Sequence, residues 1–75
     1  MTGNDHLCAA FLAAMADRPD DLNAIEAEAV RAVFVERRSV PEAVRVLGVN
    51  RHTLAHRVAR ARRWLRAWEG MRRAA

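Results

Sequence analysis

The sequence contains no lysine and no tyrosine, and only one cysteine, two prolines and three glycines among its 75 residues. A single cysteine, Cys8, excludes an internal disulfide, and no spacing of cysteine and histidine is that of a zinc site. No apolar run approaches the ~18 residues of a membrane span, and no basic region followed by an apolar block opens the chain. We therefore expect a cytoplasmic protein without membrane attachment, metal or cofactor.

Groups for catalysis are equally scarce. No nucleophile stands beside a base, no pair of carboxylates marks a cleft, and no glycine-rich phosphate loop is present. The sequence therefore predicts a binding protein and not an enzyme. Its length predicts one small domain over residues 1–75. Its richness in Ala, Val and Leu, with few Gly and Pro residues, predicts an all-α fold.

The charged residues divide the chain into two unlike halves. Residues 1–36 carry seven acidic residues and two arginines, a net charge of −5, whereas residues 37–75 carry eleven arginines and two glutamates, a net charge of +9. A concentrated positive charge predicts a polyanionic partner. Arginine suits both phosphate oxygens and the guanine edge. A GC-rich genome would also explain the absence of lysine, so the clustering of the arginines is the stronger indication.

Apolar periodicity predicts two helices in the acidic half. The first is expected over about residues 5–16. Pro19 interrupts the pattern, and Asp20 or Asp21 is expected to cap a second helix that ends near residue 36. The residues predicted for the inner face of this second helix are Ile25, Ala29, Val30, Val33 and Phe34.

The arginine-rich half begins with strong helix boundary signals. Ser39 and Glu42 have the S-x-x-E spacing of a capping box. They predict a short helix over about residues 40–47, which Gly48 ends in a left-handed conformation. Asn50 is then expected to cap a long fourth helix.

A short helix, a tight turn and a second helix with a polar start form the layout of a helix-turn-helix, here about residues 39–60. We therefore expect an all-α bundle of four to five helices that contains this motif. The motif needs apolar residues where its two helices pack together. Such residues are present at Val44, Leu47, Val49, Leu54 and Val58.

A rotation of about 100° per residue places one face of the fourth helix opposite Leu54. This exposed face, which carries His52, His56, Ala59 and Arg63, is expected to meet DNA, and Arg57, Arg60 and Arg62 on its flanks are suited to phosphates. His52 and His56 could in principle bind a metal at their spacing of four residues, but no third ligand is near in sequence. The predicted base contacts are Asn50, Arg51, His52 and His56. The predicted phosphate contacts are Arg45, Arg57, Arg60 and Arg63.

Three families share parts of this pattern. The segment LGVNRHTL resembles the helix-turn-helix of Fis-type proteins. The pattern LGV-RHTL-HRV-RARRWLR, within residues 47–66, is similar to the helix-turn-helix of region 4 of sigma factors. Residues 30–58 resemble, without a gap, the KorA/TrfB-type plasmid repressors, which bind palindromic operators as dimers. Two positions depart from the usual pattern: Val44 stands where a small alanine is common, and Arg57 where many such motifs are apolar.

These resemblances imply a sequence-specific regulator of transcription that binds double-stranded DNA, and we expect a small dimeric repressor. The alternative is a module similar to sigma region 4 that docks on RNA polymerase or another regulator. In that case the acidic half of the chain would be the surface that meets the partner protein.

The fourth helix also carries an apolar seam with heptad-like spacing, at Leu54, Val58, Ala61, Leu65 and Trp68. Its later residues extend beyond the point where the first three helices are expected to cover them. The predicted dimer interface is therefore Trp64, Leu65, Trp68 and Met71. The alternative is that the first helix covers these residues within the same chain, through Phe11 and Met15.

Overall fold

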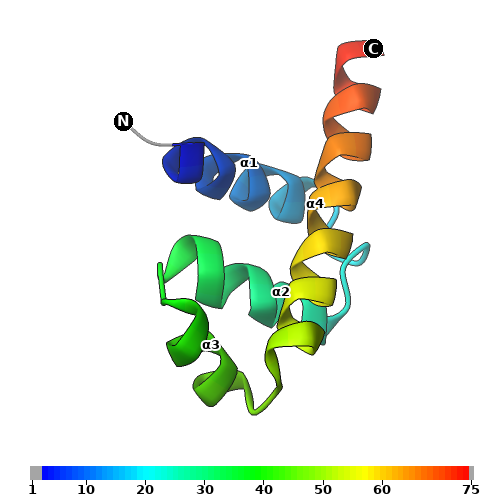
Figure 1. Ribbon diagram of the computed structural model, residues 1–75. Helices are drawn as coiled ribbons and strands as arrows, with labels where there is room; N and C mark the ends of the chain where they lie inside the picture. Colours follow the sequence, from blue (N-terminus) through cyan, green and yellow to red (C-terminus); the bar gives the residue numbers. More distant parts are fainter. Residues whose placement is uncertain (1–2, 75) are drawn as a thin grey trace.

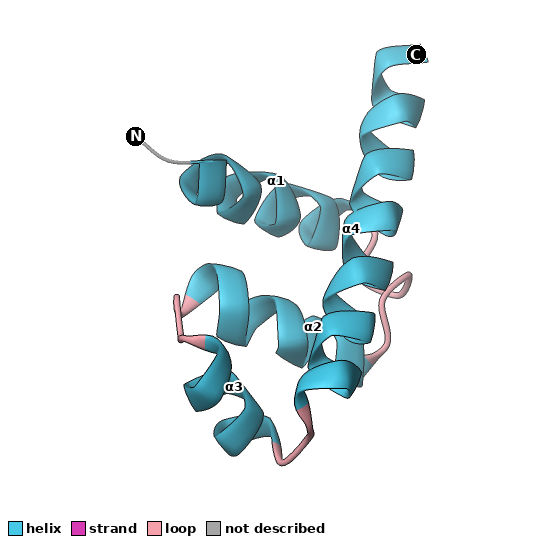
Figure 2. Cartoon of the chain, in the orientation of Figure 1, coloured by secondary structure: helices cyan, strands magenta, loops and turns pink. Residues whose placement is uncertain are grey.

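The computed structural model describes residues 3–74, which contain four α-helices and one π-helical turn joined by short connections (Figures 1 and 2). These elements are α1 (Gly3–Asp17), α2 (Ala24–Val30), the π-helical turn η1 (Arg31–Val35), α3 (Val40–Leu47) and α4 (Arg51–Ala74). No strand occurs in the described part, so the predicted all-α class is confirmed. Over the same residues, no helix combines the length and the hydropathy that a membrane crossing requires.

Helix α2 begins at a capping box that differs from the predicted cap. The side chain of Asn23 accepts a hydrogen bond from the amide of Glu26 at 2.8 Å, and the Glu26 carboxylate accepts one from the Asn23 amide at 3.4 Å. This pair satisfies two amide donors at the start of the helix. The prediction that Asp20 or Asp21 caps α2 is therefore wrong.

The inner face of α2 is also rotated relative to the prediction. Ala29 and Val30 are buried as expected, but Ile25 is 51% exposed and Glu26 is buried. The reason is angular: at about 100° per residue, Ile25 lies well to one side of a stripe centred on Glu26 and Val30. The chain continues from α2 into η1, where the amide of Glu36 donates to the carbonyl of Arg31 at 2.7 Å.

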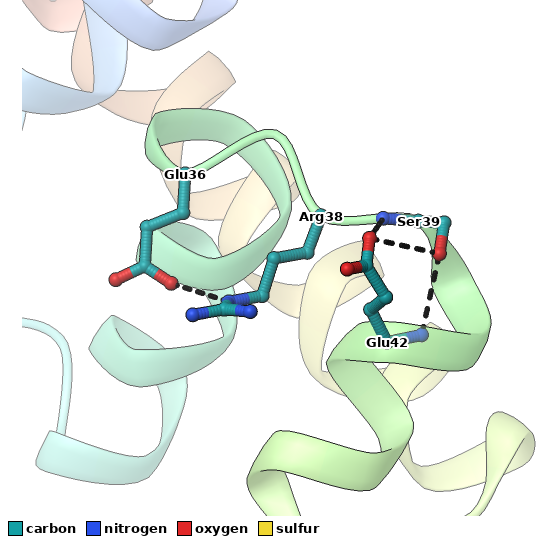
Figure 3. A network of polar contacts seen from close by, with 4 residues as sticks. All are labelled: Glu36, Arg38, Ser39 and Glu42. Carbon is teal, nitrogen blue, oxygen red and sulfur yellow. Dashed lines mark hydrogen bonds and ion pairs between the residues drawn. The ribbon is translucent and has the colours of Figure 1, made fainter.

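The connection from η1 to α3 reverses the chain within four residues. Arg37 has a φ of 55°, and the amide of Arg38 donates to the carbonyl of Ala32 at 3.0 Å. A left-handed residue followed by a hydrogen bond back to the last turn is a common way for a helix to end, usually with glycine at that residue. Arg38 also pairs with Glu36 at 2.7 Å, beside the first turn of α3 (Figure 3).

The predicted boundaries of α3 are confirmed. Glu42 donates its amide to the Ser39 hydroxyl at 3.3 Å, and the Glu42 carboxylate accepts from the Ser39 amide at 3.1 Å (Figure 3). At the other end Gly48 has φ 67° and ψ 35°, the left-handed conformation. Asn50 then accepts a hydrogen bond from the amide of Thr53 at 2.8 Å, as predicted for the start of α4.

Two apolar clusters meet on α4. The first joins α1, α2, η1 and the middle of α4, and its buried residues are Phe11, Ala14, Val30, Phe34, Ala61, Leu65 and Trp68. The second joins α2, η1, α3 and the start of α4 around Ala29, Ala32, Ala43 and Leu54. All five apolar residues predicted to pack α3 against α4 belong to this second cluster or contact it: Val44, Leu47, Val49, Leu54 and Val58.

The later part of α4 is covered by α1 within the same chain. Leu65 is 2% exposed and Trp68 5% exposed, and Phe11 lies in the same cluster. The indole of Trp68 also donates to the Asp17 carboxylate at 2.8 Å. The expectation that Leu65 and Trp68 remain as dimer surface is therefore wrong, because α1 already covers them.

The other two residues predicted for the dimer interface, Trp64 and Met71, are less buried than Leu65 and Trp68. Trp64 is half-buried and donates its indole N–H to Asp21 at 3.2 Å. Met71 is 53% exposed, in the last turns of α4, which extend past α1 in Figure 1.

Candidate nucleic-acid interface

The start of α4 lies beside α3 at the end of the molecule away from the C-terminus (Figure 1). Asn50, Arg51, His52 and His56 are all exposed there. Leu54, which is buried, lies on the side of the same turns opposite His52 and His56. The four predicted base-contact residues are therefore all accessible at the start of α4, although not all on one face of the helix.

Asn50 has a structural task at this surface. Its side-chain oxygen accepts the hydrogen bond from Thr53 that caps α4. An asparagine that reads adenine uses its amide oxygen and nitrogen together. While Asn50 caps the helix, its oxygen already accepts one hydrogen bond and the cap fixes the orientation of the amide, so Arg51 is better placed for bidentate contacts.

An open hollow of about 560 Å³ adjoins Arg51 and His52. Its remaining lining is apolar and comes from η1, the start of α3 and the first turns of α4: Val33, Val40, Leu54, Ala55 and Val58. The hollow gives the polar start of α4 an apolar neighbour, of the kind that suits a thymine methyl group.

The four predicted phosphate contacts have different surroundings. Arg45, in the last turn of α3, and Arg63, on α4, are exposed. Arg57 is half-buried. The guanidinium of Arg60 lies 3.4 Å from the carboxylate of Glu26, so its charge is already opposed within the chain.

Two further arginines of α4, Arg62 and Arg66, line a second open hollow, which measures about 410 Å³. The sequence placed Arg62 on a flank of the helix suited to phosphates, whereas it assigned no individual role to Arg66. The guanidinium of Arg62 lies 5.7 Å from the centre of the Phe34 ring, a cation–π arrangement that orients the side chain. The other lining residues are Ala55, Val58, Ala59 and Arg63. The charge of Arg62 and Arg66 and their angle about α4 were visible in the sequence, but the neighbours on that side of α4 follow only from the packing of α1 and η1.

The other candidate ligands are dispersed. Across the described residues, no three His, Cys, Asp or Glu side chains come together in a group that could hold a metal ion. Cys8 is half-buried in α1. The surface around the start of α4 therefore gathers the strongest concentration of candidate functional residues, and its chemistry is that of cationic and hydrogen-bonding side chains. No protein-family model, curated protein or solved structure matches this chain.

Proposed function

We propose that α3, the turn at Gly48 and α4 form a helix-turn-helix, and that the protein binds duplex DNA as a sequence-specific regulator of transcription, most simply as a small repressor. One observation carries this proposal. Helix α4 buries Leu54 against α3 and η1, while His52 and His56 lie on the opposite side of the same turns and Arg51 is exposed at the first residue of the helix.

The geometry agrees with the dimensions of DNA. The major groove, about 12 Å wide, admits one α-helix, and the first turns of a recognition helix contact base edges there. Arg51 would present its planar fork to a guanine, and His52 and His56 would reach neighbouring bases. Arg45 and Arg63 would contact phosphates, which fix the position of the helix without reading sequence.

Two copies are needed for a unique site. One recognition helix reads only about four to five base pairs, and two-fold symmetric pairs commonly bind half-sites about 34 Å apart. Leu65 and Trp68 are core residues and do not supply the contact between the copies. The proposal is therefore two copies on one palindromic site, which the stoichiometry on a selected duplex tests.

The test of function is selection of duplexes from a random pool, followed by affinity measurements on the selected and an unrelated duplex at about 150 mM salt. We expect a clear preference for the selected sequence. Arg51→Ala should weaken binding to the selected duplex by about 1–3 kcal/mol and change binding to unrelated DNA little. Arg63→Ala is the matched control: it should weaken binding to both duplexes alike and lower the salt slope by about one.

Affinity that follows ionic strength alone, without preference among duplexes, would contradict sequence-specific recognition. It would favour the other candidate, a module that docks on RNA polymerase or another regulator. Equal losses on both duplexes for Arg51→Ala would leave DNA binding in place and remove Arg51 from base reading.

A further inference from the structure

The exposed face of α4 is bordered by two flanks that differ in charge. One side of α4 carries Arg57, Arg60 and Trp64 and faces the α1–α2 connection and the start of α2. We call this side the acidic flank, because carboxylates of those two segments lie against it. The other side carries Arg62 and Arg66 and faces η1 and the first turns of α1. We call it the arginine flank after these two residues. Their separation follows from the helical rotation of about 100° per residue.

Three carboxylates lie along the acidic flank and its continuation. Glu26 approaches Arg60 at 3.4 Å, and Asp21 accepts a hydrogen bond from Trp64 at 3.2 Å. One turn further, Asp17 accepts the hydrogen bond of Trp68 at 2.8 Å. A phosphate on this flank would approach negative charge, and it would have to compete with Glu26 for Arg60.

Glu26 strengthens this argument because its side chain is only 11% exposed. A largely buried carboxylate that loses its cationic partner is costly. The ion pair with Arg60 is therefore a structural feature of the α2–α4 contact, and its net charge is zero.

The arginine flank has the opposite character. Arg62 and Arg66 line both the second hollow, over Ala55 and Ala59, and a third hollow of about 290 Å³ toward Leu7. The alanine side chains leave room for a ligand to approach the helix closely. Phe34 is buried and holds the Arg62 guanidinium in place, which reduces the conformational entropy that Arg62 loses on binding.

We propose that the sugar–phosphate backbone of duplex DNA runs along the arginine flank, with Arg62 and Arg66 as phosphate contacts, and that Arg57 and Arg60 on the acidic flank take no part. This inference rests on the proposed function, since it requires that α4 binds duplex DNA. Glu69 lines the third hollow beside Arg66 and places a carboxylate there, so the phosphate contacts along the arginine flank end at Arg66.

Two double variants of the full chain test the proposal, because each removes two positive charges from the same helix. We compare Arg62→Gln/Arg66→Gln with Arg57→Gln/Arg60→Gln by fluorescence anisotropy on a random-sequence duplex of about 20 base pairs, long enough for two helical turns. Phosphate contacts are independent of sequence, so no operator is required. Screening over about 8 Å at 150 mM salt confines the comparison to local contacts.

We expect the arginine-flank variant to lose roughly 10- to 100-fold in affinity and to lower the salt slope by about two. The acidic-flank variant should lose at most a few-fold and keep the wild-type slope. Far-UV circular dichroism and melting curves check that each variant is folded. The single variants Arg66→Gln and Arg57→Gln, at residues without a structural ion pair, repeat the comparison if a double variant unfolds.

Each other outcome overturns the inference in a recognisable way. The acidic-flank variants could lose affinity and salt slope while the arginine-flank variants keep both. The DNA backbone would then run along the acidic flank, which contradicts the inference but leaves the proposed DNA binding in place. Equal losses of affinity in the two double variants would show that the total charge of α4 attracts DNA and that the DNA backbone does not follow one flank. If the wild-type protein binds no duplex at all, the proposed function is wrong, and so is the inference that DNA phosphates contact the arginine flank.

Discussion

Gly48 and Gly70 show how one residue type serves two unrelated backbone conformations in this protein. Gly48 has a φ of 67°, in the left-handed region, at the turn between α3 and α4. Gly70 lies within α4 and is exposed. A Cβ atom built at either glycine meets no atom within 4 Å, so steric crowding is absent at both positions. Any difference between their substitutions must therefore come from the backbone.

We expect alanine to have opposite effects at these two glycines. Gly48→Ala should destabilise the fold by about 1–2 kcal/mol, since a Cβ disfavours the left-handed conformation. Gly70→Ala should stabilise it by about 0.5–1 kcal/mol, since alanine loses less backbone entropy than glycine in a helix. Urea denaturation of both variants measures the two changes.

Gly48→Asn provides a graded control, because asparagine tolerates the left-handed region better than alanine. Its loss of stability should be smaller than that of Gly48→Ala. A neutral Gly48→Ala variant would mean that the chain can turn elsewhere between α3 and α4.

At the scale of the elements, the start of α3 depends on one carboxylate. Hydrogen bonds from the backbone amide and the hydroxyl of Ser39 hold the pKa of Glu42 below its usual value of 4.5. The positive charges of Arg38 and Arg45 act in the same direction. A carboxylate with a lowered pKa in the folded state adds stability above its unfolded pKa. This stability is lost as the pH falls below 4.5 and through the folded pKa.

Glu42→Gln should therefore reduce stability at neutral pH and make no difference in strong acid. The wild-type and variant stability curves, measured by urea denaturation at pH values from about 7 to about 2, should converge as the pH falls. Ser39→Ala removes the hydroxyl donor and should weaken the pH dependence in part. Curves that stay parallel across this range would show that the Glu42 carboxylate does not stabilise α3.

The elements also show what a sequence can predict and where it stops. The boundaries of α3 were predictable because Ser39, Glu42 and Gly48 act through neighbours within four residues. Asn23 offered the same signal, with Glu26 three residues later, but the acidic residues at 20 and 21 are equally good caps in isolation. Only the packing of α2 against α4, which buries Glu26, distinguishes them.

The flanks of α4 lay beyond sequence reasoning for a related reason. Helical rotation gives the angle of each arginine about α4, and it correctly placed Arg63 on the exposed side. It does not give the neighbours on either side, which come from helices distant in sequence. Arg60 was predicted to be free for phosphate, whereas Glu26, 34 positions earlier, lies against it.

On the scale of the whole molecule, α4 is the element to which the others attach. Its 24 residues, at about 1.5 Å of rise each, span most of the 40 Å long axis of the molecule. Residues of α1, α2, η1 and α3 all pack on it. Three acidic residues from the negative half bind to side chains of α4 through hydrogen bonds or an ion pair: Asp17, Asp21 and Glu26. The acidic half thus neutralises one side of the basic helix and leaves the rest exposed.

This arrangement makes Trp68 a test of how the molecule is assembled. Trp68 is 5% exposed beneath α1, donates to Asp17, and has the Arg72 guanidinium 4.8 Å from the centre of its ring. Replacing a buried tryptophan by alanine costs about 3–5 kcal/mol. For 75 residues at about 0.05–0.15 kcal/mol each, that is a large part of the total stability.

We expect Trp68→Ala to lower the melting temperature strongly or to unfold the chain. The decrease in melting temperature should be the same at every protein concentration. Met71→Ala is the matched control on the same helix, because Met71 is 53% exposed and should leave the melting temperature nearly unchanged. Concentration-dependent melting curves and sedimentation velocity of the wild type and both variants make the comparison. If Trp68→Ala keeps its helical signal but sediments as a smaller particle than the wild type, Trp68 joins two chains. In that case a second chain, and not α1, would cover Trp68, since a residue that closes the core of one chain cannot be removed without loss of that chain's own fold.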